Sequence, residues 1–190
     1  MEAYNNNSEK AEPGEVLLDS ATIRKRVGEL GAQIASDYGG IIPLPDSSKP
    51  LLVGILKGAS IFHADLVRAI PLDLSYDFIA ISSYGNSTSS CGEVRFLKDL
   101  DQSPEGKDVL LVEDIVDTGL TLNYLKQNLL ARKPNSLKIV VLLNKQPRRQ
   151  IDLHLDYVGF DVPDAFLVGY GLDFGQRYRN LNDIRILRQE

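Results

Sequence analysis

Apolar residues follow two different patterns along this chain, a helical period and short continuous runs, which predict helices and strands in alternation. Over residues 20–37 an apolar residue returns at every third or fourth position, which predicts an amphipathic helix capped by Asp19 or Ser20 and carried by Ile23, Val27, Leu30 and Ile34. Continuous apolar runs flanked by turn residues predict buried strands at 51–56 and 109–112, and further strands are expected at 76–82 and 137–143. Further helices are expected around 61–70 and over 121–132.

The order of these elements predicts an α/β fold. Strand and helix alternate over residues 51–143, so we expect a mostly parallel central sheet with helices on both faces. Residues 94–97 are expected to return as an antiparallel partner of the strand at 76–82. After residue 144, turn residues and aromatics become frequent and no helical period runs through 157–178. This region therefore predicts a small hood of short strands and loops over the edge where the parallel strands end and active loops gather.

Length, charge and cysteine content exclude several classes of protein. The chain has 190 residues, 43% of them hydrophobic and 25% charged, which is typical of one globular domain spanning 1–190, with a polar, flexible tail at 1–14. A formal net charge of -5 without a long basic run argues against nucleic acid or an anionic membrane as a partner. No apolar run approaches the ~20 residues of a membrane helix, and the N-terminus lacks the apolar core of a signal peptide. The single cysteine, Cys91, cannot form an intrachain disulfide, so we expect a reducing compartment, the cytoplasm.

The segment VEDIVDTGLT at 112–121 carries the strongest chemical signal. It follows the strand at 109–112 directly, so we expect Glu113 and Asp114 at the carboxyl end of that strand, where a turn brings both toward one ligand. The residues that open the next helix would cradle a phosphate with hydroxyls, backbone N–H groups and a glycine: Asp117, Thr118, Gly119 and Thr121. Carboxylates repel phosphate, so the mixture indicates a sugar phosphate whose hydroxyls, metal ion or developing positive charge require them.

Two lysines follow other predicted strands and should reach the same edge. Lys57 and Gly58 form a loop between strand and helix, a plausible anion site. Lys145 follows the strand at 137–143. Each alone could be an ordinary solvated lysine, and the Ser- and Gly-rich stretch at 83–93 could be a plain mobile linker. No GxxxxGK[ST] motif occurs, which disfavours a P-loop nucleotide hydrolase.

Taken in order, five segments make the chain similar to the type I phosphoribosyltransferases, and among them to the hypoxanthine (guanine) phosphoribosyltransferases. The segments are GILKGA at 54–59, SSYGNSTSSCGE at 82–93, VEDIVDTGLT at 112–121, NK at 144–145 and YVGFDVPDAFLVGYGLDFGQRYRN at 157–180. The resemblance covers roughly residues 16–185. It implies transfer of a phosphoribosyl group from 5-phosphoribosyl diphosphate to a purine base, with Mg²⁺ as cofactor.

The resemblance also implies a role for each candidate residue. Asp117 would exchange a proton with N7 of the purine, while the ribose phosphate would be bound by Glu113, Asp114, Asp117, Thr118, Gly119 and Thr121. Pyrophosphate would be bound by Lys57, Gly58, Ser83, Tyr84 and Arg179, and the Lys57–Gly58 peptide can be cis in the family. The purine would be bound by Lys145 through its 6-oxygen, by stacking on Phe166, by the backbone of Leu167 and by Asp173. Magnesium would be held by Glu113, Asp114 and Asp173, directly or through water.

Three alternatives stay open at this stage. The same site chemistry would serve a xanthine-preferring enzyme, because the groups that recognise the purine 2-position cannot be placed. A nucleotide-sensing regulator of the same fold would need no aspartate at 117, and a pyrimidine or adenine phosphoribosyltransferase would not need Lys145. The chain differs from some family members at Leu120 and Ala165. A homodimer or homotetramer is expected, since the family commonly forms one.

Overall fold

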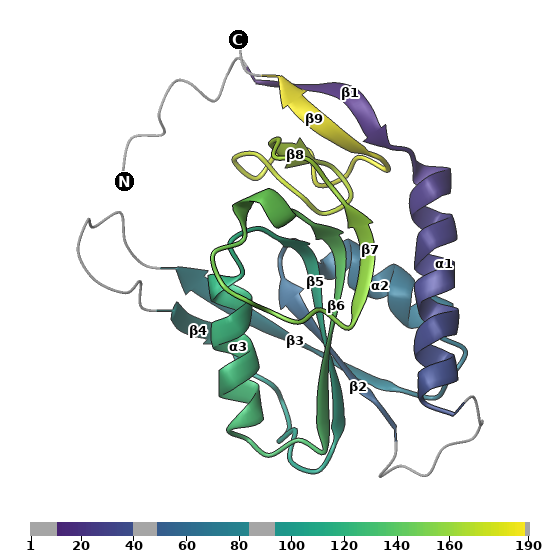
Figure 1. The fold of residues 1–190 in the computed structure, drawn as a ribbon, viewed down its shortest axis with the longest axis vertical. Helices are drawn as coiled ribbons and strands as arrows, with labels where there is room; N and C mark the ends of the chain where they lie inside the picture. Colours follow the sequence, from purple (N-terminus) through teal and green to yellow (C-terminus); the bar gives the residue numbers. More distant parts are fainter. Residues whose placement is uncertain (1–10, 40–48, 84–93, 189–190) are drawn as a thin grey trace.

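The structure, a computed structural model, describes residues 11–39, 49–83 and 94–188 and contains a six-stranded and a three-stranded sheet (Figure 1). The larger sheet has the strand order β4 (Val94–Lys98), β3 (Ser75–Ser83), β2 (Leu51–Leu56), β5 (Asp108–Val116), β6 (Ser136–Asn144) and β7 (Tyr157–Asp161). All neighbouring pairs are parallel except β3 and β4. The predicted parallel sheet and its antiparallel return strand are therefore confirmed.

Three helices cover the two faces of this sheet. Helices α1 (Ser20–Asp37) and α2 (Ser60–Ala69) lie on one face, and α3 (Leu120–Leu130) lies on the other (Figure 1). The predicted cap of α1 is confirmed, because the Asp19 side chain accepts a hydrogen bond from the Thr22 backbone N–H at 2.7 Å. That contact satisfies one of the free N–H groups of the first turn. No helix in the described ranges is long and apolar enough to cross a membrane.

Alternate residues of the central strands pack on opposite faces, which explains why these strands are apolar throughout. Leu52 and Leu110 are fully buried against α1 and α2, whereas their neighbours Val53 and Leu111 are fully buried against α3. A strand covered on both faces can expose neither set of side chains. The sheet is thus a rigid support for the loops at its carboxyl edge.

The smaller sheet forms the hood, and here the sequence-based prediction needs two corrections. Its antiparallel strand order is β1 (Glu12–Leu18), β9 (Ile184–Arg188), β8 (Leu167–Val168), so the N-terminal segment belongs to the hood and residues 12–14 are not a loose tail. The local sequence of β1 does not predict a strand, and its extended conformation depends on the backbone hydrogen bonds that it makes with β9. Conversely, Tyr157–Asp161 is not in the hood, because it pairs in parallel with β6 as the edge strand of the larger sheet.

Strand β5 is longer than the sequence predicts. It continues to Val116, whose partner across the ladder is Asn144, so Glu113 and Asp114 lie within the strand and the turn begins after them. The prediction of a turn at these carboxylates is therefore wrong. The backbone pairing with β6 keeps this part extended despite two charged residues, and neighbouring side chains in an extended strand point to opposite faces.

Candidate active site

A cavity of about 380 Å³ lies at the carboxyl edge of the larger sheet, between the sheet and the hood. It brings together eight residues that the sequence predicts for the site: Gly58, Asp114, Asp117, Lys145, Phe166, Leu167, Asp173 and Arg179. These residues come from the ends of β2, β5 and β6 and from the hood. The carboxyl edge of a parallel sheet is where open α/β folds bind ligands.

The acidic pair of β5 is divided between two environments. Asp114 lines the cavity and is only 7% exposed, and burial raises the pKa of its carboxyl group. Glu113 is not among the residues that line the cavity, and burial, followed by the adjacent Asp114 carboxylate, raises the pKa of Glu113 well above its usual range. Two adjacent carboxylates, one buried and one half-buried, are costly without a cation. The pair is therefore suited to a ligand that brings positive charge or hydroxyl donors.

Asp117 stands directly after β5 and faces the same cavity. Its Oδ1 atom is buried and accepts no hydrogen bond, although Nε of Arg148 lies 3.2 Å away in an ion pair. A carboxylate oxygen with unused acceptor capacity in a cavity can accept a hydrogen bond or a proton from a ligand.

Lys145, Phe166 and Leu167 also line the cavity. The Lys145 side chain is buried, its Nζ donates a hydrogen bond to the carbonyl of Ala165 at 2.9 Å, and the carboxylate of Asp164 lies 3.9 Å away. An ammonium has three donors, so this lysine keeps hydrogen-bonding capacity for a ligand oxygen. Phe166 is 47% exposed, and its ring meets the ring of Phe174 edge-on with the two ring centroids 5.5 Å apart. This arrangement leaves a face of the Phe166 ring for stacking.

The hood contributes an ion pair between Asp173 and Arg179, whose closest atoms are 2.7 Å apart. Arg179 also donates to the carbonyl of Gly171 at 2.6 Å, while its buried Nε has no hydrogen-bond partner. This nitrogen could donate to an anion. Nζ of Lys57 lies 3.4 Å from the side-chain oxygen of Gln176, so Lys57 reaches the hood although it does not line the cavity.

The cis peptide is one residue earlier than the family pattern suggested. The bond between Leu56 and Lys57 is cis. The Lys57–Gly58 bond is not cis, and no further cis peptide bond occurs in the part of the chain that the structure describes. The loop that follows packs tightly against the acidic strand, because a Cβ atom at Gly58 would overlap the Asp114 carboxylate.

Several predicted residues lie outside the cavity. Thr118, Gly119 and Thr121 form the turn after β5 and the first residues of α3, next to the cavity but not lining it. Ser83 is the last residue of β3, and its side chain and Tyr84 fall outside the described residues. Within the described ranges, no three His, Cys, Asp or Glu side chains converge to hold a metal ion. A protein-only magnesium cage formed by Glu113, Asp114 and Asp173 is therefore absent from these ranges.

Three residues of the cavity were missed by the sequence analysis: Ile115, Arg148 and Leu172. Arg148 could have been found, because it lies three positions after Lys145 in the loop that follows β6. Its guanidinium group contacts Asp117 and lies 3.8 Å from the Asp164 carboxylate. It therefore places a cation between the two acidic groups at the mouth of the cavity.

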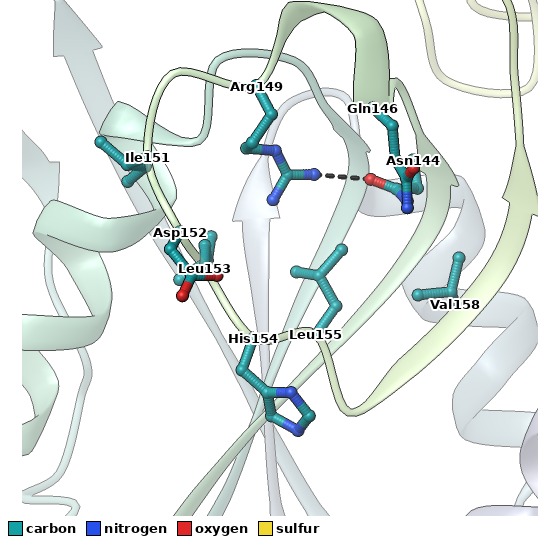
Figure 2. Close-up of a pocket in the computed structure, with 9 residues that line it drawn as sticks. All are labelled: Asn144, Gln146, Arg149, Ile151, Asp152, Leu153, His154, Leu155 and Val158. Atoms are coloured by element: carbon teal, nitrogen blue, oxygen red, sulfur yellow. Dashed lines mark hydrogen bonds between the residues drawn. The ribbon is translucent and has the colours of Figure 1, made fainter.

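A larger hollow of about 630 Å³ lies behind the loop at residues 146–155, and Figure 2 shows its lining. None of the predicted site residues lines it. The guanidinium group of Arg149 points into this hollow and is hydrogen-bonded to Asn144, which comes immediately before Lys145 (Figure 2).

Comparison with known proteins agrees with this geometry. The family model described as a phosphoribosyl transferase domain matches residues 15–175. Hypoxanthine-guanine phosphoribosyltransferases of Bacillus subtilis (strain 168) and Mycobacterium bovis are 51% and 49% identical, and the alignments cover 91% and 90% of this chain and 92% and 85% of the relatives. The crystal structure of a hypoxanthine phosphoribosyltransferase from Staphylococcus aureus superimposes with a TM-score of 0.85 at 47% identity, covering 93% of this chain and 92% of the other.

Proposed function

This chain belongs to the phosphoribosyl transferase family, and we propose on that premise that it is a purine-salvage enzyme. It converts hypoxanthine, and guanine, with 5-phosphoribosyl diphosphate into the corresponding nucleoside monophosphate and pyrophosphate. The observation that carries this function is the convergence of Asp117, Lys145 and Phe166 on one cavity at the carboxyl edge of the sheet.

The purine lies between the ring of Phe166 and the polar groups opposite. Lys145 donates to the 6-oxygen of the base, and because an ammonium has only donors it rejects the 6-amino group of adenine. Leu167 offers backbone groups to the ring, and Asp173 lies near the base. The burial of Lys145 supports this role, since the desolvated ammonium gains most from a ligand acceptor.

Asp117 transfers the proton. It accepts the N7 proton as the new bond forms between the base and the anomeric carbon, and returns it in the reverse reaction. Its buried Oδ1, which lacks a hydrogen-bond donor, supports this role. Nearby, Thr118, Gly119 and Thr121 bind the ribose 5-phosphate at the start of α3, whose N-cap residue, Gly119, has no side chain to bond the N–H groups of the first turn.

Pyrophosphate is held by Lys57, Gly58 and Arg179, with Ser83 and Tyr84 as further contacts. The buried, unpaired Nε of Arg179 supports this assignment, since a guanidinium fork suits a diphosphate. Asp114, which lines the cavity, faces the ribose hydroxyls, and the negative charge of Asp114 and of the adjacent Glu113 stabilises the positive charge that develops as pyrophosphate leaves.

Magnesium fits this site as a substrate-bound ion. Mg²⁺ in such enzymes is commonly held by one or two carboxylates together with substrate phosphates, so a complete protein cage is not required. The buried Asp114 carboxylate and Asp173, which line the same cavity, would hold it with Glu113 nearby. The ion would neutralise the diphosphate and so favour its departure. We further propose a homodimer or homotetramer working in the cytoplasm.

The test is an assay of purified protein with 5-phosphoribosyl diphosphate and Mg²⁺, offering hypoxanthine, guanine, xanthine or adenine separately. Nucleotide formation from hypoxanthine and guanine that stops on chelation is the expected result. Faster turnover of xanthine would make this a xanthine-preferring enzyme. Efficient turnover of adenine would contradict the role of Lys145.

A further inference from the structure

We propose that Arg149 is a positioning residue, which fixes the phosphate-side turn after β5 relative to the purine-side end of β6 without touching substrate. The inference rests on the proposed function, because it assigns these two sides of the site their ligands. Arg149 lines the larger hollow (Figure 2) and is not among the residues that line the active cavity.

The first contact of Arg149 is with a buried amide. Its Nη2 donates to Oδ1 of Asn144 at 2.5 Å, and Asn144 is only 4% exposed. Burial lowers the pKa of Arg149, the nearby negative charge of Asp117 partly offsets this, and Nε of Arg149 is buried without a hydrogen-bond partner. A guanidinium group that is partly removed from water depends on the hydrogen bonds left to it, so losing the bond to Asn144 is costly.

Asn144 connects this arginine to two strands. Its Nδ2 donates to Oδ1 of Asp161 at 2.7 Å, and its carbonyl accepts from the Val162 N–H at 3.0 Å. Asn144 and Asp161 are also direct partners in the ladder between β6 and β7. The chain leaving β7 leads to Phe166 and Leu167, and Lys145 follows Asn144 directly. Asn144 therefore sets the direction in which both purine-side segments leave the sheet.

Arg149 also supports the phosphate-side turn from behind. Its aliphatic stem packs on Gly119, since a Cβ atom built on that glycine would lie 3.1 Å from Cδ of Arg149. The adjacent Gln150 N–H donates to the carbonyl of Thr118 at 3.1 Å. Together with the hydrogen bond from Lys145 N–H to the Val116 carbonyl at 3.0 Å, these contacts join the loop after β6 to the turn after β5.

One side chain thus spans the two halves of the reaction site. The reacting atoms must approach within a fraction of an ångström of their productive positions, and small displacements by residues away from the chemistry are expensive in rate. Loss of the Arg149 guanidinium group should let the turn at Asp117 and the end of β6 at Lys145 move relative to each other.

The test compares Arg149→Met with wild type. Methionine keeps an unbranched stem against Gly119 but loses the fork that binds Asn144. We expect kcat/KM for hypoxanthine to fall about 10- to 100-fold, with a rise in KM for both substrates. Arg149→Lys, which keeps a donor, should recover part of the loss. Asn144→Ala should cost at least as much, because it also loses the hydrogen bond to Asp161. The double variant should be little worse than Asn144→Ala alone, because the contact between Arg149 and Asn144 is already absent in that single variant.

The control is Arg132→Ala, which removes an arginine paired with Asp99 at 2.7 and 2.9 Å and with Asn128 on α3, away from the site. It should lower thermal stability while kcat and KM remain as in wild type. If Arg149→Met and Asn144→Ala behave like this control, or if their effects on kcat/KM multiply fully, the positioning role is wrong. Inactive wild-type protein would instead refute the proposed function, so the two failures are distinguishable.

Discussion

Gly171 joins the hood to the pyrophosphate loop, and replacing it with alanine should damage both stability and substrate binding. Its φ of +102° is a conformation that residues with a Cβ atom rarely adopt. An added Cβ would overlap the carbonyl oxygen of Gly58. Gly171 is held in place because its N–H donates to the Arg179 carbonyl at 3.0 Å and its carbonyl accepts from the Arg179 side chain at 2.6 Å. On the other side, Gly58 is packed closely against the Asp114 carboxylate.

Two costs add in Gly171→Ala. The backbone strain costs about 1–3 kcal/mol. Overpacking against a fixed backbone costs about 1–3 kcal/mol more. At about 2–4 °C per kcal/mol for a chain of this size, a loss near the middle of this range lowers Tm by about 10 °C. Relief by movement of Gly58 or Arg179 would displace groups that bind pyrophosphate, so KM for 5-phosphoribosyl diphosphate should rise about tenfold, a loss of about 1.4 kcal/mol.

Matched controls separate these terms. Gly175 also has a positive φ, +58°, but an added Cβ there meets nothing within 4 Å, so Gly175→Ala should cost only about 1 kcal/mol of backbone strain. Gly28 in helix α1 has open space and an ordinary helical position, so Gly28→Ala should be neutral or slightly stabilising. Thermal unfolding and initial-rate kinetics are measured on all three. If Gly171→Ala and Gly175→Ala have the same Tm and the same KM for 5-phosphoribosyl diphosphate, the contact between Gly171 and Gly58 supports neither stability nor pyrophosphate binding.

Three further predictions concern charged groups of the site. Asp117→Asn should lower kcat by about 10²–10⁴-fold with little change in substrate affinity, and equal losses in kcat and affinity, measured by initial rates and calorimetry, would refute proton transfer by Asp117. Burial raises the pKa of Asp114, so ionising this carboxyl group lowers the free energy of unfolding. This loss of stability is absent below the pKa of the carboxyl group in the unfolded chain, and it grows as the pH rises through the raised pKa of the folded protein. Without ligands, Asp114→Asn should therefore have a higher Tm than wild type at pH 7.5, and this difference in Tm should shrink as the pH falls toward about 4. The variant should also lose turnover, and a Tm below that of wild type at pH 7.5 would contradict the reasoning. Lys145→Met should reduce kcat/KM for hypoxanthine about 10²-fold or more, and the ratio of kcat/KM for hypoxanthine to that for adenine should fall. If this ratio is unchanged, Lys145 does not select the 6-oxygen.

Much of the larger sheet could be predicted from sequence because its signals are local. Leu51–Leu56 is apolar on every position, as a strand covered on both faces must be, and α1 carries both its apolar stripe and its cap within nineteen residues, Asp19 to Asp37. The N-terminal strand β1 could not be predicted in this way. It contains Pro13 and Gly14, and its extended form depends on β9, far away in the chain.

The site was predictable to the extent that its residues follow strands. Asp117 and Lys145 come directly after β5 and β6, and parallel strands bring their carboxyl ends together. The error at Glu113 and Asp114 arose because charge was taken as the end of the strand, whereas pairing with β6 carries β5 through to Val116. Arg149 gives no signal in the sequence that separates it from Arg148, because only its contact with Asn144 distinguishes it.

One reaction tests the proposed catalytic activity most directly. Purified protein is mixed with hypoxanthine, 5-phosphoribosyl diphosphate and Mg²⁺, and the nucleotide and pyrophosphate are quantified over time. We predict that inosine monophosphate and pyrophosphate form in equal amounts and that both stop on chelation of the metal. Absence of the nucleotide, with tight binding of ready-made nucleotide, would contradict catalysis and indicate a regulator built on this fold.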